Sequence, residues 1–194
     1  MKGMKDHLTI LGIAGSLRKQ SYNRGALRAA QQLCPEGAKI EIFELDGIPG
    51  FNQDEEKNPP PAVVELKKEI RAADAILFVT PEYNYGLPGV LKNAIDWASR
   101  PYGDNAWDGK PCAIMSAAMS MGGGIRAQYQ LRQSFVFLNM EAVVQPEVAI
   151  NNVAERFDQQ SNLKDETSKK LIGQLLQNLV RKVRLMRPAM KAAA

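Results

Sequence analysis

The sequence predicts an α/β fold in which an open parallel β-sheet has helices on both faces. Five short apolar segments of strand type alternate along the 194 residues with segments of helical periodicity. Parallel neighbouring strands need crossover connections, and helices supply them. Three loops of unusual composition directly follow three of the strands, where open parallel sheets bind their ligands.

The elements follow one another in a regular order. The first strand, LTILGIA, is nearly all apolar, which is typical of a strand buried on both faces. Pro88 suits the first turn of a helix, and Pro146, which lacks an N–H, is a candidate break in the fifth strand. We expect strands at 8–14, 39–45, 75–80, 111–116 and 141–150, and helices from 23 to about 34 and at 62–73, 88–98, 125–138 and 165–186.

Composition limits the class of protein. Hydrophobic residues make up 45% of the chain and charged residues 24%, as in average soluble proteins. We expect one domain, residues 1–194, with its core at about 8–186. The N-terminal MKGMKDHLTI lacks the features of a secretory signal, which predicts a cytoplasmic protein without membrane insertion. Cys34 and Cys112 lack the spacing of metal ligands, so no metal site is predicted.

The net charge is mildly basic and gives little support to nucleic-acid binding. Lys and Arg number 25 against 21 Asp and Glu, and the isoelectric point is about 9.1. The cations are dispersed, so no nucleic-acid partner is predicted. The cluster Arg181, Lys182, Arg184 and Arg187 is assigned to the negative end of the last helix.

The loop after the first strand, GSLRKQSYNR, is rich in hydrogen-bond donors. Ser16 and Ser21 hydroxyls, the Asn23 amide and the Arg18 guanidinium, together with N–H groups at the start of the next helix, could surround a terminal phosphate. A solvated turn in which Ser21 or Asn23 caps the helix is an equally good interpretation. The loop lacks a P-loop lysine, a G-x-G-x-x-G motif and a nucleophilic cysteine, so it would bind a phosphomonoester without attacking it.

The other two loops suit a planar group. TPEYNYGLPG, residues 80–89, offers flat faces and amide donors, although Tyr83 and Tyr85 could be ordinary interface or core aromatics. In the loop from Ser116 to Gly124, three consecutive glycines allow close approach of main-chain N–H groups to a ligand. A turn that merely needs positive φ would explain the same glycines.

These stretches together resemble the NADPH-dependent FMN reductase family, a flavodoxin-like group that includes quinone, chromate and azo-dye reductases. The similarity covers residues 8–150, and PEYN…PG.LKNAIDW is its most specific part. The resemblance implies a three-layer sandwich with strand order 2-1-3-4-5. It places the FMN phosphate and the flavin ring on the following residues: Ser16, Arg18, Ser21 and Asn23 for the phosphate; Pro81, Glu82, Tyr83, Asn84, Ser116, Ala117, Gly122 and Gly123 for the ring.

The resemblance also implies a reaction. NADPH or NADH would reduce bound FMN and leave, and a quinone, chromate or another metal oxyanion, an azo compound or a flavin would then take the electrons in a ping-pong scheme. No general acid or base is nominated, because the flavin supplies the chemistry. His7, the only histidine, precedes the first strand and is assigned no role. Met119, Ser120 and Met121 depart from the Pro and Gly that relatives usually carry there, which affects the acceptor pocket.

Two other functions compete with this one. A flavodoxin-type electron carrier would have the same fold, but such carriers are typically acidic and this chain is basic. A structural protein with an empty site would leave the donor-rich first loop unexplained. The resemblance further implies a homodimer or homotetramer, for which Tyr85, Arg100, Arg126, Tyr129 and Glu147 are candidate interface groups, with intrachain ion pairs as the alternative.

Overall fold

The computed structural model describes residues 7–192, and the side chains of residues 7–186. Strands and helices alternate as the sequence predicts, and most boundaries agree within two residues. The elements are β1 (Leu8–Ala14), α1 (Tyr22–Gln32), β2 (Ala38–Phe43), η1 (Gln53–Glu55), α2 (Pro61–Ala72), β3 (Ala75–Thr80), α3 (Gly89–Ala98), β4 (Pro111–Ala117), α4 (Ile125–Leu138), β5 (Glu141–Ala142), β6 (Val148–Ile150), α5 (Val153–Arg156) and α6 (Glu166–Ala192).

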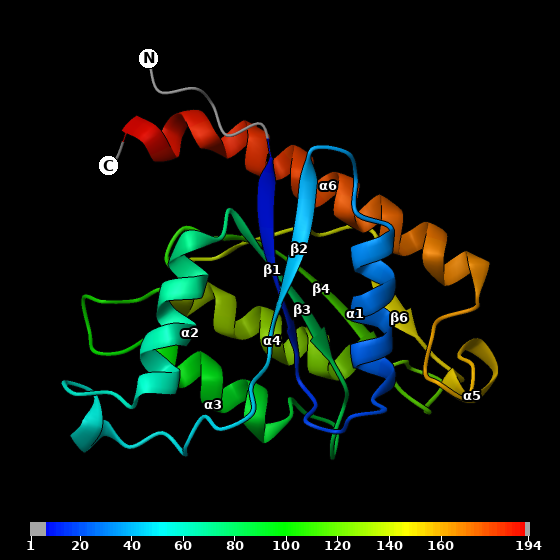
Figure 1. Ribbon diagram of the computed structural model, residues 1–194, viewed down its shortest axis with the longest axis horizontal. Coiled ribbons are helices and arrows are strands. Elements are labelled where there is room, and N and C mark those ends of the chain that lie inside the picture. The colour runs from blue at the N-terminus through cyan, green and yellow to red at the C-terminus, as the bar shows by residue number, and fades with distance from the viewer. Residues whose placement is uncertain (1–6, 193–194) are drawn as a thin grey trace.

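All strands of the sheet run parallel, in the order β2-β1-β3-β4-β5, with β6 also paired to β4. This confirms the predicted order 2-1-3-4-5 and the flavodoxin-like fold. From β1, the chain adds β2 on one side of the sheet and then β3, β4 and β5 on the other side. The direction in which strands are added therefore reverses between β1 and β3. The carboxyl ends of these strands point toward the lower part of Figure 1, and their loops gather there.

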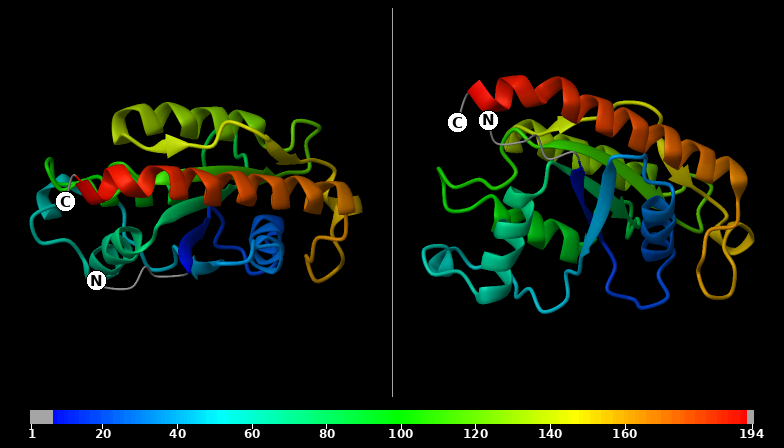
Figure 2. Two further views of the ribbon diagram at one scale, coloured as in Figure 1. Left: turned by 90° about the horizontal axis from the view of Figure 1, so that it is seen from above. Right: turned by 45° about the horizontal axis from the view of Figure 1, so that its top comes forward.

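Alternate residues of the central strands enter two separate cores. In β3, Leu77 and Val79 pack in the core beneath α1 and α6, whereas Ile76 and Phe78 pack in the core beneath α2, α3 and α4. Figure 1 shows α1 to one side of the strands and α2 and α3 to the other, and both views of Figure 2 show α6 crossing the whole width of the molecule. A strand covered on both faces must be apolar throughout, which explains the unbroken AILFVT run.

The structure differs from the predicted elements at the C-terminal side. The predicted fifth strand divides into β5, beside the start of β4, and β6, beside its end. Pro146 lies in the segment between them, after a cis peptide bond. A proline cannot donate to the ladder, so the break falls at the residue that the sequence singled out. The short elements η1 and α5 were not predicted.

The C-terminal cations do not have the role that the sequence suggested. Helix α6 continues to Ala192, so Arg181, Lys182 and Arg184 lie before its last turn, where the helix dipole has little effect. Lys182 instead forms an ion pair with Glu141, with a nitrogen–oxygen distance of 3.0 Å. The side chain of Arg187 lies outside the described residues. No helix within residues 7–192 combines the length and the apolar character needed to cross a membrane.

Helix α1 packs very closely on the segment after α5, and we predict that Gly25→Ala destabilises the protein. A Cβ at Gly25 would lie 1.9 Å from the main-chain oxygen of Ser161. Overpacking of this kind should lower the free energy of unfolding by about 2 kcal/mol in a urea titration.

The matched control is Gly173→Ala in α6, where an added Cβ would meet nothing within 4 Å. There the higher helix propensity of alanine should raise the free energy of unfolding by up to about 1 kcal/mol. Equal effects of the two substitutions would contradict the close packing at Gly25.

Candidate functional site

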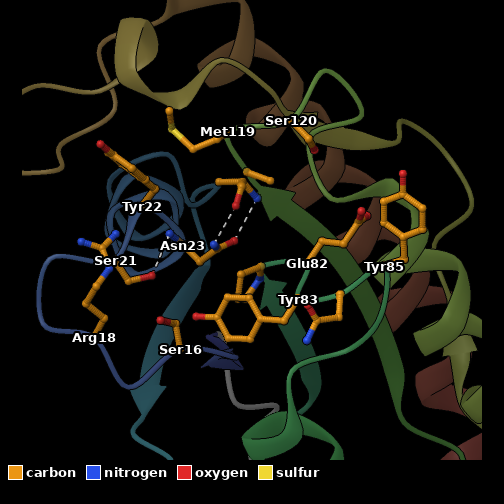
Figure 3. A pocket seen from close by; sticks show the side chains of 14 residues that line it. Ser16, Arg18, Ser21, Tyr22, Asn23, Glu82, Tyr83, Tyr85, Met119 and Ser120 are labelled. Atoms are coloured by element: carbon orange, nitrogen blue, oxygen red, sulfur yellow. Dashed lines mark hydrogen bonds between the residues drawn. The ribbon is translucent and has the colours of Figure 1, made fainter.

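The loops after β1, β3 and β4 converge on one pocket of about 490 Å³. It lies at the carboxyl ends of the strands, beside the point where the strand order reverses, which is the usual ligand position in open α/β sheets. Figure 3 shows the side chains around it. The lining residues are Ser16, Arg18, Ser21, Tyr22, Asn23, Pro81, Glu82, Tyr83, Asn84, Tyr85, Ala117, Ala118, Met119 and Ser120.

One end of the pocket brings together hydroxyl groups, a guanidinium and a helix N-terminus. Ser16 and Ser21 are almost fully buried, with 4% and 2% of their surfaces exposed, and they lie beside Arg18 (Figure 3). Ser21 is also the N-cap of α1, because its hydroxyl oxygen accepts the main-chain N–H of Asn23 at 3.2 Å. The hydroxyl hydrogen of Ser21 is still available to a ligand. The first turn of α1 carries no acidic side chain, so the helix N-terminus adds to the attraction for a negative charge.

Of the three cations in this first loop, only Arg18 lines the pocket. Its guanidinium lies over the Tyr22 ring, 5.4 Å from the ring centroid. Arg24 forms an ion pair with Glu44 instead, and Lys19 is exposed. The positive charge available at this end therefore comes from one side chain and from the helix.

The Asn23 side chain connects two of the converging loops. Its amide nitrogen donates to the main-chain oxygen of Ala117 at 2.8 Å, and its amide oxygen accepts the Ala117 N–H at 2.9 Å. Asn23 therefore joins the start of α1 to the end of β4, as the dashed lines in Figure 3 show. The sequence predicted a donor for phosphate at this position. Only the second amide hydrogen is left for that purpose, so its main contact is with the protein.

The opposite end of the pocket is formed by the loop after β3. Tyr83 and Gly86 exchange two main-chain hydrogen bonds, at 3.0 and 2.9 Å, and close a tight turn around Asn84 and Tyr85. Both central residues have positive φ, 50° and 62°. Figure 3 shows the Tyr83 side chain directed across the pocket toward Ser16. Pro81, Tyr83 and Asn84 thus line this end of the pocket, and Pro81 and Tyr83 contribute flat rings.

Glu82 lies at the N-terminus of α4. Its carboxylate accepts the main-chain N–H of Arg126 at 3.0 Å and pairs with the Arg126 guanidinium, also at 3.0 Å. This helix N-terminus directly follows the glycine-rich loop, and its free N–H groups attract negative charge. The Glu82 carboxylate already occupies the N-terminus of α4. The N-terminus of α1 has no such carboxylate and stays open to a negative charge.

The loop after β4 contributes fewer of the predicted residues than expected. Ala117 lines the pocket, but Ser116, Gly122 and Gly123 do not. The Ser116 hydroxyl is fully buried, donates to the main-chain oxygen of Gly123 at 2.6 Å and accepts from the Gln128 side chain at 2.7 Å. Gly123 has φ of 59°, and a Cβ there would lie 2.7 Å from the Ala149 main chain. Ser116 and Gly123 therefore hold the loop together outside the pocket, and the positive-φ interpretation of the glycines applies at Gly123 and Gly124.

Several lining residues were not among the predicted site residues. Met119 and Ser120 line the pocket (Figure 3), although the sequence marked them only as a departure from relatives. Tyr85 was considered both as a flat face for a ligand and as an interface or core aromatic, and nothing in the sequence pointed to Ala118. Tyr22 could have been found from its place directly after the N-cap of α1, where it packs on Phe157 with ring centroids 5.1 Å apart. No group of three metal-ligating side chains occurs among the residues that the structure describes.

Comparison with known proteins agrees with this geometry. Residues 8–155 match the family of NADPH-dependent FMN reductases. The chain is 49% identical over 185 residues to an NAD(P)H-dependent FMN reductase of Pseudomonas aeruginosa, which covers 95% of this chain and 100% of that protein. It is 45% identical over 165 residues to a quinone reductase of Pseudomonas putida, which covers 84% of this chain and 89% of that protein.

A solved structure is also similar. The flavoenzyme FerB, an NAD(P)H:acceptor oxidoreductase of Paracoccus denitrificans, superimposes with a TM-score of 0.83 at 33% sequence identity. The match covers 91% of this chain and 97% of FerB. The family match over residues 8–155 includes the sheet and all three loops of the pocket.

Proposed function

Because the chain belongs to the NADPH-dependent FMN reductase family, we propose that it is an FMN-containing NAD(P)H oxidoreductase. The observation that carries the proposal is the pocket itself, which has a cationic, hydroxyl-rich end at Arg18 and a flat wall at Pro81–Asn84. A planar ring system with a terminal phosphate has the same distribution of groups. FMN is such a molecule.

The residues present fit FMN in size and chemistry. A volume of about 490 Å³ falls within the usual range for cofactor pockets, roughly 300 to 1,000 Å³. In the proposed arrangement, Ser16, Ser21 and Arg18 bind the phosphate, and the dipole of α1 strengthens the attraction for its negative charge. The Asn23 side chain holds the start of α1 against Ala117 at the end of β4. Pro81–Asn84 and Ala117 lie along the ring, while Ser116, Gly122 and Gly123 act through the loop shape.

FMN, when bound, takes hydride from NAD(P)H and passes electrons to an acceptor. The chain offers one phosphate-binding loop and one open side, so we propose that NAD(P)H and the acceptor use that side in turn, as in a ping-pong scheme. Tyr83 and Met119 line the pocket with 53% and 65% of their surfaces exposed, and they leave an apolar rim suited to flat molecules. We therefore propose quinones as the main acceptors, with azo compounds, flavins and metal oxyanions such as chromate as further ones. The cytoplasmic location stays a prediction.

The proposed reaction predicts a visible spectral change. The purified protein should carry a bound flavin with the visible absorption of its oxidised form, and anaerobic NADPH should bleach it. Added benzoquinone should restore the absorption. A flavin that NADPH does not reduce would indicate an electron carrier instead, and a protein without affinity for FMN would contradict both functions.

The proposed phosphate site predicts that Arg18→Ala weakens FMN binding. Loss of a charged hydrogen bond should cost about 1.5 to 3 kcal/mol, roughly a ten- to hundredfold rise in Kd. Quenching of FMN fluorescence on titration with apoprotein measures this value. Lys19→Ala is the matched control, since Lys19 is exposed and does not line the pocket. Equal Kd values for the two variants would place the phosphate elsewhere.

We further propose that the protein is a homodimer or homotetramer. Most candidate interface groups already have partners within the chain: Arg126 binds Glu82, and Arg100 binds Glu56 at 3.2 Å. A hydrogen bond to the Glu147 carboxylate raises the pKa of Tyr129. Support comes instead from α4, where Val136 and Phe137 are 86% and 74% exposed. Adjacent apolar side chains so exposed favour a protein contact, and a second copy is the occupant we propose.

Sedimentation at micromolar concentration should therefore give two or four times the monomer mass of 21.4 kDa. Phe137→Glu should lower it, because a carboxylate in an apolar interface is costly. Val64→Glu, on an exposed apolar side chain of α2, is the control and should leave the mass unchanged. A wild-type monomer would contradict the proposal.

A further inference from the structure

The turn at Tyr83–Gly86 has a backbone conformation that one of its two central residues, Tyr85, disfavours. Positive φ at both central positions is characteristic of a type I′ turn, for which Asn-Gly is the preferred pair. Asn84 tolerates such a conformation, but Tyr85, at φ of 62°, does not adopt it readily. Strained conformations of this kind persist only where surrounding contacts hold them, and they cluster at functional sites.

Helix α4 supplies contacts on both sides of the turn. Before the turn, Arg126 binds the Glu82 carboxylate with its main-chain N–H and its guanidinium, both at 3.0 Å. After the turn, the Gln130 side-chain oxygen accepts the N–H of Leu87 at 2.6 Å. Residues four apart lie on one face of a helix, so one face of α4 holds the entry and the exit of the turn.

Arg126 also contacts the strained residue itself. Its guanidinium carbon lies 4.0 Å from the centroid of the Tyr85 ring, a distance typical of a cation–π contact. The Tyr85 residue is 73% exposed, so few other contacts fix its ring. Figure 3 shows Glu82 and Tyr85 together on one side of the turn, while Tyr83 points away from them toward Ser16.

We propose that Arg126 is a positioning residue that keeps the turn at Tyr83–Gly86 in its positive-φ shape and so sets the wall of the cofactor pocket. The proposal rests on the proposed function, because it assumes that FMN lies against this wall. Arg126 does not line the pocket, and its side chain is 47% exposed, whereas that of Glu82 is 6% exposed. It acts through Glu82 and Tyr85.

This role predicts an interaction between two substitutions. Arg126→Ala should raise the Kd for FMN about tenfold and shift the flavin absorption spectrum, because the turn relaxes. Tyr85→Gly creates an Asn-Gly pair that adopts the turn without help. In that background, Arg126→Ala should change the Kd by less than about threefold. Fluorescence titration of the four apoproteins, made by removing the flavin, measures the cycle.

Controls separate positioning from loss of charge or of folding. Arg184→Ala removes an exposed arginine of α6 and should leave the Kd unchanged. Gln130→Ala should weaken FMN binding in the same direction as Arg126→Ala, and it serves as the second variant if Arg126→Ala fails to fold. Sedimentation of each variant excludes a change of oligomeric state as the cause.

The outcomes distinguish this proposal from the proposed function. A wild-type protein that does not bind FMN contradicts the proposed function and removes the basis of the inference. If the wild-type protein binds FMN, an unchanged Kd in Arg126→Ala contradicts the positioning role alone. A tenfold loss that is equally large in the Tyr85→Gly background also contradicts it, because Arg126 would then act independently of the turn.

Discussion

The burial of β1, β3 and β4 on both faces is the constraint on which the rest of this structure depends. Each strand must present apolar side chains to two cores, and β3 does so with every residue from Ala75 to Thr80 buried. Such strands are mostly apolar. The polar side chains that line the pocket come from the segments that follow the strands, and the parallel arrangement brings those segments to one edge. The pocket results directly from the way the sheet is packed.

The loops are held in place by polar contacts between side chains of one segment and groups of another. Asn23 joins α1 to the end of β4, the Ser116 hydroxyl joins β4 to Gly123, and Glu82 joins the loop after β3 to α4. These contacts also make the site electrostatically asymmetric. The N-terminus of α4 already has a carboxylate, while the first turn of α1 has none. Of these two helix ends, the one of α1 is therefore the one open to a further negative charge.

The fold was predictable because its signals are local. Apolar runs identified the strands, helical spacing identified α1 to α4, and the missing N–H of Pro146 marked the break between β5 and β6. The composition of the first loop and the family resemblance of the second also identified half of the pocket lining, since Ser16, Arg18, Ser21 and Pro81–Asn84 all contribute. Long-range polar contacts left no such signal. Nothing in the local sequence shows that the Arg24 side chain pairs with Glu44 or that Ser116 faces away from the pocket.

The sequence by itself determined the order of the elements, the three loops that carry chemistry and the resemblance to FMN reductases, because each depends on residue types at short spacing. The tertiary structure decided which side chains of those loops point into the pocket and which hold the loops together. Asn23 illustrates the difference: an amide next to two hydroxyls suits a phosphate, yet its partner Ala117 is 94 residues away. Packing brings such groups together only when the sheet forms, and a buried main-chain group must then find a partner.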